Sequence, residues 1–175
     1  MSKPSQTLSA WNKLNSKPLG KWLFSHLVSL KAPYFFSIGG KFKELRPGYC
    51  EVHLKKRRKV HNHIGTVHAI AICNLAELVA GTITDATVPA DTHRWIPKAM
   101  SVEYLAKAKT NLHAIAKFDP MPVFEGDFEL PVTVNVYDSN DQIVFRALIT
   151  MWITERKKNS KTVKRLTPGL KFKSD

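Results

Sequence analysis

One carboxylate, Glu77, lies within a long apolar segment that runs from Ala69 to Ala80. An ionised carboxylate without partners is unstable in an apolar interior, so burial raises its pKa unless hydrogen bonds compensate. A carboxyl group with a raised pKa is a good general base near neutral pH, and it can also attack a carbonyl carbon directly. Glu77 is therefore a candidate catalytic group, although a buried carboxylate can also serve only as a hydrogen-bonding partner of a neighbouring group.

Asn62, Gly65 and His68 precede this segment at intervals of three residues. A glycine permits a tight turn, and the first turn of a helix leaves backbone N–H groups without helical partners at the positive end of its dipole. The amides around His68 and Ala69 can thus bind a developing oxyanion, while Asn62 would orient water or substrate. Each residue alone fits a turn or a helix cap, and only their joint spacing favours a site.

The chain is strongly basic, since 27 lysine and arginine residues against 14 aspartate and glutamate residues give a formal net charge of +13. This charge favours an anionic partner, either nucleic acid or a phosphate-bearing thioester, and part of it fits ordinary solvated surface. Basic residues gather in residues 55–59, directly before Asn62, and in residues 156–173. The first block adjoins the candidate site.

Chain length and cysteine content limit the remaining possibilities. The length fits one domain, no run approaches the roughly 18 apolar residues of a transmembrane helix, and residues 1–7 lack the apolar stretch of a secretory signal, so a cytoplasmic protein is expected. Cys50 and Cys73 fit two free thiols in a reducing compartment. The sequence contains no C-x-x-C or H-E-x-x-H spacing, so no zinc site is predicted.

Two helices are predicted at the N-terminal end, from apolar residues at helical spacing in residues 8–14 and 19–30. The second is basic and amphipathic, so it can cover the core, which is the commoner role, or lie on a membrane surface. After Pro33, residues 34–45 and 49–58 are predicted to form two strands joined at a Pro-Gly turn.

The central helix is predicted to run from about Thr66 to Gly81, followed by a loop that contains Pro89 and Pro97. Alternation with period two predicts four more strands in residues 102–108, 112–118, 130–136 and 143–153. This order indicates an α+β fold in which one antiparallel sheet wraps a single helix. The predicted segments are an N-terminal helical extension (1–32), a core domain (33–155) and a basic C-terminal tail (156–175).

The order of elements and the motif together resemble the hotdog-fold thioesterases, in which a curved antiparallel sheet surrounds a long central helix. In the branch with the phenylacetate-pathway and human mitochondria-associated acyl-CoA thioesterases, the pattern is N-x-x-G-x-x-H-G-G, with an acidic residue nine positions after the histidine. Asn62, Gly65, His68 and Glu77 keep that spacing. The chain also resembles an uncharacterised subfamily of this fold, the domain of unknown function DUF4442. The resemblance implies about five to six strands around the helix.

The resemblance also implies hydrolysis of acyl thioesters of coenzyme A or acyl carrier protein, with coenzyme A present only as part of the substrate and no other cofactor. Glu77 would act as base or nucleophile. The residues expected to bind substrate and its phosphates are Asn74, Arg57, Arg58, Lys59 and Lys107. Two departures are visible: Ala69 and Ile70 replace the Gly-Gly pair, and Pro97 stands near the place where many relatives have a serine or threonine.

Helix geometry limits how His68 and Glu77 can act together. Nine residues place them roughly 13 Å apart along the helix axis and on nearly opposite faces. One chain therefore cannot bring both to one thioester, which implies a composite site at a two-fold interface. A homodimer is expected, and pairing of dimers into tetramers stays open.

Two other functions stay open at the level of sequence. The chain can be a protein that binds an acyl thioester without hydrolysing it, which the loss of Gly-Gly would permit. It can also be a basic nucleic-acid-binding protein, although only the net charge favours this, because no nucleic-acid-binding motif and no aromatic residues clustered with the basic blocks are found.

Overall fold

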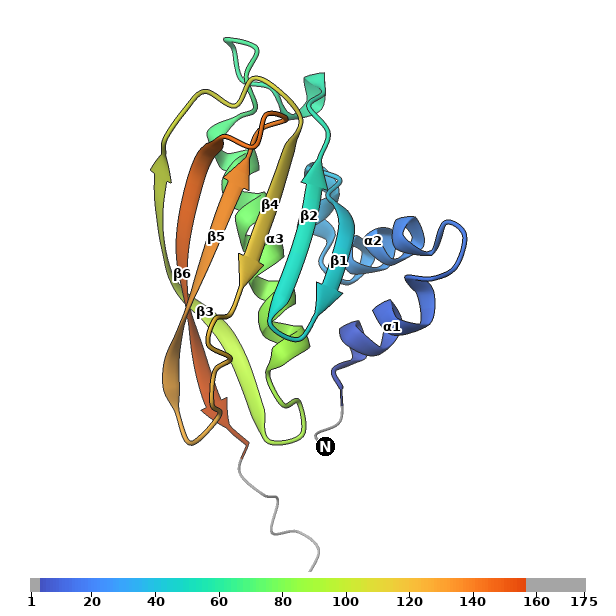
Figure 1. Cartoon of the computed structure of the whole chain (residues 1–175), viewed down its shortest axis with the longest axis vertical. Helices are drawn as coiled ribbons and strands as arrows, with labels where there is room; N and C mark the ends of the chain where they lie inside the picture. The colour runs from blue at the N-terminus through green and yellow to red at the C-terminus, as the bar shows by residue number, and fades with distance from the viewer. Residues whose placement is uncertain (1–3, 157–175) are drawn as a thin grey trace, which may run out of the picture.

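The computed structural model describes residues 4–156 and contains a six-stranded antiparallel sheet that curves around one long helix (Figure 1). The strand order β1-β2-β4-β5-β6-β3 leaves β1 and β3 at the two edges. The strands are β1 (Lys41–Arg46), β2 (Tyr49–Leu54), β3 (His93–Tyr104), β4 (Leu112–Lys117), β5 (Phe128–Tyr137) and β6 (Ile143–Glu155). The predicted hotdog arrangement is therefore confirmed, while all but the first residue of the predicted basic tail lies outside the described residues.

The central helix, α3 (Ala69–Thr87), buries most of its surface inside the sheet. By length and composition it could cross a membrane, but its apolar character is that of a core helix, because most of it is buried inside the protein. The predicted end at Gly81 is wrong, since the helix continues to Thr87. A glycine inside a helix costs only about 1 kcal/mol, and here it makes room for Trp95, whose ring would lie 3.3 Å from an added Cβ.

Three predicted strands have different bounds in the structure. Residues 33–37 form the short 3-10 helix η1 (Pro33–Ser37), because Pro33 is suited to the first turn of a helix. The basic block leaves β2 at Leu54 and leads into η2 (Arg58–Val60). Pro97 lies within β3 and not in a loop, because an edge strand tolerates a residue without an N–H group. The strand predicted for residues 102–108 is the last part of β3, which ends at Tyr104.

The two predicted N-terminal helices form as α1 (Gln6–Leu14) and α2 (Gly20–Lys31), beside β1 (Figure 1). Phe24 of α2 is 1% exposed, and its ring meets those of Trp11 and Phe42 edge-on, each at a centroid distance of 5.0 Å. Leu8, Trp11 and Phe24 belong to the same hydrophobic core as the sheet and α3. The N-terminal helices therefore share the core of the sheet and α3, and the segment boundary at residue 32 stays a prediction.

This shared core predicts that Phe24→Ala lowers the free energy of unfolding by about 3–5 kcal/mol, as expected when a buried phenylalanine leaves a cavity. Urea unfolding followed by circular dichroism measures the loss. Phe36→Ala is the matched control, because Phe36 is 40% exposed and should cost much less. Equal losses for the two variants would mean that α2 is not part of the core.

Candidate functional site

The loop before α3 is a tight turn organised by Asn62. Its Oδ1 accepts hydrogen bonds from the backbone N–H groups of Ile64 (3.2 Å) and Thr66 (3.0 Å), and its Nδ2 donates to Thr66 Oγ1 (2.7 Å). Gly65 adopts a φ of 75°, which favours glycine strongly. Asn62 is thus bound into the turn that aims the chain at α3, and a role in orienting substrate stays a prediction.

His68 caps α3. Its Nδ1 accepts a hydrogen bond from the backbone N–H of Ile70 at 3.1 Å, which assigns the ring proton of the neutral form to Nε2. The side chain is exposed, so Nε2–H is free to donate to a ligand. The neighbouring N–H of Ala69 has no acceptor among residues 4–156. Two donors therefore remain at the positive end of the helix dipole.

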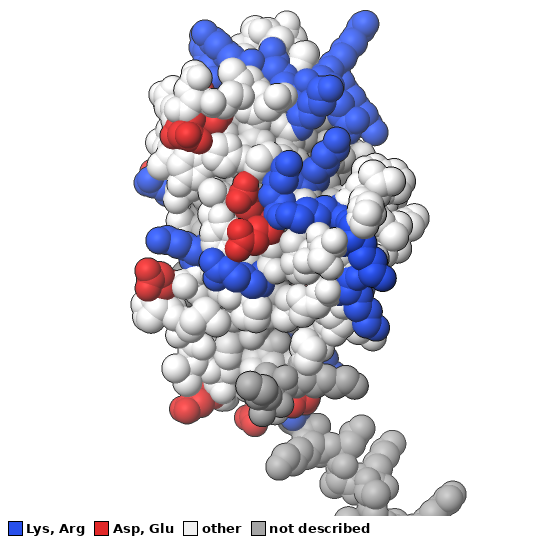
Figure 2. Space-filling view, turned by 45° about the vertical axis from the view of Figure 1, so that its right-hand side comes forward, with Lys and Arg blue, Asp and Glu red and all other residues white. Residues whose placement is uncertain are grey.

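Basic side chains flank this end of α3. The Arg57 guanidinium donates to the carbonyl oxygen of Ile38 at 3.1 Å, and Lys59 Nζ donates to that of Phe36 at 3.4 Å, while Arg58 is exposed. Figure 2 shows Lys and Arg side chains gathered at the upper end of the molecule, where the loop from β2 to α3 lies in Figure 1.

Lys107, in the segment that follows β3, also lies near the start of α3. It is exposed, and its neighbour Ala108 accepts a hydrogen bond from the backbone N–H of Val67 at 2.9 Å, directly before the cap of α3. Of the five residues predicted to bind substrate, Lys107 and the three of the basic block thus lie around the start of α3. Whether they bind phosphate stays a prediction.

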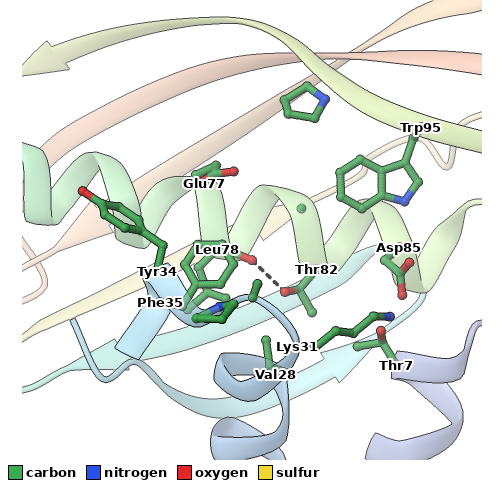
Figure 3. A pocket seen from close by; sticks show the side chains of 14 residues that line it. Thr7, Val28, Lys31, Tyr34, Phe35, Glu77, Leu78, Thr82, Asp85 and Trp95 are labelled. Atoms are coloured by element: carbon green, nitrogen blue, oxygen red, sulfur yellow. Dashed lines mark hydrogen bonds between the residues drawn. The ribbon is translucent and has the colours of Figure 1, made fainter. Parts of the chain in front are cut away.

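Glu77 lies on the wall of a pocket of about 500 Å³ between α3, β3 and the N-terminal helices (Figure 3). Its side chain is half-buried and has no hydrogen-bond partner among the described residues, and desolvation by burial raises the pKa of its carboxyl group. The other residues that line the pocket are mostly apolar or aromatic: Val28, Ala32, Pro33, Tyr34, Phe35, Leu78, Gly81, Trp95 and Pro97, with Thr7, Lys31, Thr82 and Asp85 as the polar ones.

Asp85 and Trp95 were missed by the sequence analysis. Asp85 lies eight residues after Glu77, so the two share one side of α3, and its buried Oδ2 has no hydrogen-bond partner among residues 4–156. Figure 3 shows Lys31 and Thr7 at the same end of the pocket as Asp85. The spacing of Glu77, Gly81 and Asp85 would have identified this side of α3 if the predicted helix had continued beyond Gly81.

Asn74 does not line the pocket, and its role in binding substrate stays a prediction. It is 6% exposed, and its Nδ2 donates to Ser37 Oγ at 2.9 Å, which ties η1 to α3. Its Oδ1 is buried without a donor in the described part of the chain. One turn of α3 before Glu77, Cys73 Sγ lies 3.2 Å from Tyr104 Oη, and this contact, followed by burial, raises the pKa of Tyr104 to about 12.

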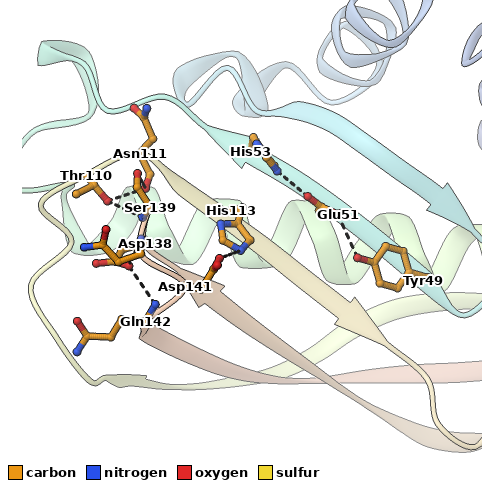
Figure 4. Close-up of polar contacts among 11 residues, drawn as sticks. Tyr49, Glu51, His53, Thr110, Asn111, His113, Asp138, Ser139, Asp141 and Gln142 are labelled. Atoms are coloured by element: carbon orange, nitrogen blue, oxygen red, sulfur yellow. Dashed lines mark hydrogen bonds and ion pairs between the residues drawn. The ribbon is translucent and has the colours of Figure 1, made fainter.

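A separate polar cluster lies on the outer face of the sheet (Figure 4). The Glu51 carboxylate accepts hydrogen bonds from Tyr49 Oη (3.1 Å) and His53 Nε2 (2.6 Å), and His113 Nε2 lies 3.5 Å from Asp141. Burial alone would raise the pKa of Glu51, but the bonds to His53 and Tyr49 hold it below its ordinary value. Within residues 4–156, no three His, Cys, Asp or Glu side chains are placed to hold a metal ion.

The structure therefore brings Asn62, Gly65, His68 and Ala69 together and leaves Glu77 two and a half turns away, on the other side of α3. Beside Glu77, the edge strand β3 is exposed over most of its length, with Ile96, Met100 and Tyr104 among its exposed apolar side chains.

A long central helix wrapped by a curved antiparallel sheet of six strands is the hotdog fold, which solved thioesterase structures share. The chain belongs to the family described as a domain of unknown function (DUF4442), whose sequence model matches residues 20–153. No curated protein matches it.

Several solved structures are similar. The structural-genomics protein APC5556 is 48% identical, with 86% of this chain and 97% of that chain covered and a TM-score of 0.73. PA5026 from Pseudomonas aeruginosa, a protein of unknown function described as a probable thioesterase, is 22% identical, covering 79% and 98% with a TM-score of 0.71. The thioesterase HI1161 from Haemophilus influenzae is 12% identical, covering 82% and 96% with a TM-score of 0.65.

The raised pKa of Glu77 gives a prediction for stability. Because the folded pKa lies above the ordinary value of 4.5, the ionised carboxylate opposes folding at pH values above the folded pKa, and this effect is lost as the pH falls through it. Glu77→Gln should therefore match or exceed the wild-type melting temperature at neutral pH. The difference in melting temperature between the variant and the wild type should vanish at a pH below 4.5, the ordinary pKa of the carboxyl group.

Thermal unfolding at the two pH values measures this effect. Glu125→Gln, at an exposed glutamate, is the matched control and should leave the melting temperature unchanged. A Glu77→Gln variant that melts lower than the wild type at neutral pH would instead identify Glu77 as a structural partner of a neighbouring group.

Proposed function

We propose that the protein hydrolyses acyl thioesters, with acyl-CoA or acyl carrier protein thioesters as substrates. The observation that carries this proposal is Glu77, a carboxyl group of raised pKa on the wall of an apolar pocket of about 500 Å³. A pocket of this volume and lining suits an acyl chain, and a partly desolvated carboxylate suits the activation of water. The thioesterase HI1161 and the probable thioesterase PA5026 share the fold, which supports the proposal.

In the proposed reaction, the Glu77 carboxylate takes a proton from a water molecule, and the water oxygen attacks the thioester carbonyl carbon. The carbonyl oxygen becomes an oxyanion, which the N–H of Ala69 and the Nε2–H of His68 stabilise. The intermediate then collapses, the carbon–sulfur bond breaks, and the thiolate takes the proton from Glu77. The products are a carboxylic acid and a free thiol.

The two halves of this site come from different chains. Glu77 and His68 lie on opposite sides of one helix, so a second copy must bring its α3 start to the first copy's Glu77. The exposed edge of β3 favours such pairing, because an unpaired strand with apolar side chains is a ready template for another strand. A homodimer with two equivalent sites follows.

A second candidate function is binding of an acyl thioester without hydrolysis. One observation favours it: the N–H of Ile70, in the position of the second glycine of the related motif, is occupied by His68 Nδ1. This leaves fewer backbone donors for an oxyanion than a glycine-rich helix start would offer. A thiol-release assay over acyl-CoA substrates of different chain lengths separates hydrolysis from binding alone.

The proposed base gives a prediction for activity. Glu77→Gln keeps the shape of the side chain but removes the base, so the rate of thiol release should fall by roughly 10²-fold or more. Glu125→Gln should retain wild-type activity. Full activity of Glu77→Gln would exclude Glu77 as base or nucleophile.

The composite site can be tested in the same assay by mixing subunits. A heterodimer of Glu77→Gln and His68→Ala chains contains one site with both groups intact and one site with neither. Each heterodimer should therefore have about half of the activity of a wild-type dimer. Random exchange in an equal mixture makes half of the dimers heterodimers, so the mixture should recover about a quarter of the wild-type activity, well above that of either variant alone. Mixtures that stay inactive despite confirmed subunit exchange would show that one chain supplies both groups.

The basic block gives a separate prediction. If Arg58 and Lys59 bind the phosphates of the carrier, the double change Arg58→Gln with Lys59→Gln should raise KM for acyl-CoA more than it lowers kcat. The control pair, Arg46→Gln with Lys117→Gln, removes the same charge at the opposite end of β1 and β4. A KM equal to that of the control would assign the block to solvated surface.

A further inference from the structure

The helix α2 presents its more apolar side to solvent. Its inner side consists mainly of small or polar residues, Gly20, Ser25 and Ser29, together with Phe24 and Val28. One polar residue, His26, is exposed on the outer side, and its ring lies 4.1 Å from that of Trp22. The rest of this side is made by Leu19 directly before the helix, Trp22, Leu23, Leu27 and Leu30, and exposed aromatic residues continue it into η1 at Tyr34 and Phe36. We call these seven residues the outer stripe. Leu19, Leu30 and Tyr34 are 79%, 63% and 69% exposed.

The orientation of α2 is fixed by contacts on its inner side. Ser25 Oγ accepts a hydrogen bond from the backbone N–H of Phe42 at 3.0 Å, and Lys21 Nζ donates to the carbonyl oxygen of Lys43 at 2.7 Å. Phe24 is held between Trp11 and Phe42. The helix therefore cannot turn its leucine residues inward without breaking these contacts, and a contiguous exposed apolar surface of this kind marks an interaction site.

The charge around the outer stripe selects the partner. Residues 1–43 contain seven lysines and no aspartate or glutamate, and Glu44 is the first acidic residue of the chain. Lys17, before α2, and Lys31, at its end, are exposed. Lys59 reaches the stripe through its bond to the carbonyl oxygen of Phe36. The partner must therefore offer both an apolar phase and negative charge.

A second copy of the chain does not fit this requirement. A two-fold contact through the outer stripe would place the same lysines of both copies close together, and like charges in an interface are unfavourable. An anionic lipid bilayer satisfies both demands, because leucine side chains enter the acyl boundary while lysines remain at the headgroups. Tryptophan and tyrosine, here Trp22 and Tyr34, favour that boundary.

We propose that the outer stripe of α2 and η1 docks the protein on the surface of an anionic lipid bilayer. The helix lies flat on the bilayer and does not cross it, with the lysines beside it in contact with the headgroups. Tyr34 belongs to the outer stripe and also lines the pocket of Glu77. Docking thus places the pocket next to the bilayer, and an acyl chain reaches Glu77 with little exposure to water. Only this last consequence rests on the proposed thioesterase function.

The test is co-sedimentation of the full-length protein with vesicles. The protein should bind vesicles of equal parts phosphatidylcholine and phosphatidylglycerol, and bind vesicles of phosphatidylcholine alone much more weakly. The triple variant Trp22→Gln, Leu23→Gln and Leu30→Gln keeps every lysine but should bind the anionic vesicles roughly ten-fold more weakly or worse. The control, Val123→Gln with Leu148→Gln, removes exposed apolar side chains elsewhere and should bind as the wild type does.

Two further measurements keep the result interpretable. Circular dichroism shows whether the triple variant is folded, and the single variant Trp22→Gln, which removes one exposed side chain, gives a milder test of the same loss. Light scattering of wild type and triple variant reports the size of the assembly. Unchanged vesicle binding by a folded triple variant would overturn the proposal, because the basic residues elsewhere would then suffice. A smaller assembly with unchanged vesicle binding would overturn it in favour of contact between copies.

The vesicle result does not depend on catalysis. If the protein binds anionic vesicles through the outer stripe but releases no thiol from any acyl-CoA, the docking proposal stands and the proposed function fails. If thiol release is normal and the triple variant binds vesicles as the wild type does, the proposed function stands and the docking proposal fails.

Discussion

The helix α3 must bury its apolar side chains inside a sheet of six strands, and the sheet covers every side of it except one. The uncovered side carries Ile70, Cys73, Glu77, Gly81 and Asp85, at intervals of three or four residues. A carboxylate on a buried side of α3 would have lost its contact with water, and one on a fully exposed helix would have kept an ordinary pKa. Because this side is only partly covered, the Glu77 carboxyl group stays accessible from the pocket while burial raises its pKa.

The N-terminal helices complete that partial cover. Asn74 binds Ser37, so η1 is held against α3, and α2 is held to β1 through Ser25. The pocket then has one wall from α3 and β3 and another from α1, α2 and η1. Residues separated by up to about half of the chain, from Thr7 to Pro97, therefore define one cavity, and the N-terminal extension is part of the candidate site as well as part of the core.

The sequence predicted best those elements that have one buried and one exposed face. The strands β4, β5 and β6 alternate strictly enough to be recognised, and the turn of Asn62 and Gly65 follows from the chemistry of two residue types. Gly81 was misleading, since glycine ends many helices, but here the tertiary contact with Trp95 outweighs its low helix propensity. Pro97 was misleading for a similar reason, because only the position of β3 at the sheet edge makes proline acceptable there.

The candidate site was predicted in part for the same physical reasons. The motif located the start of α3 and the unusual carboxylate, since both are local features, whereas Trp95, Val28 and Lys31 enter the pocket only through packing between distant elements. The side of α2 that stays exposed is likewise decided by packing between distant elements. Its leucine residues predicted an amphipathic helix, but the side that turns inward is selected by Ser25 and Phe24, whose partners lie in β1 and α1.

His68 shows how a structural role and a chemical role can coincide in one side chain. As a cap it accepts the N–H of Ile70 on Nδ1, and this bond assigns the proton to Nε2 on the exposed side of the ring. The same contact that starts the helix thus also prepares a donor beside the N–H of Ala69, which has no acceptor among residues 4–156. The absence of the Gly-Gly pair removes some backbone freedom, but the cap supplies a side-chain donor at the same helix end. Under the proposed function, the oxyanion would then be bound by one backbone group and one imidazole, and the cap would orient both.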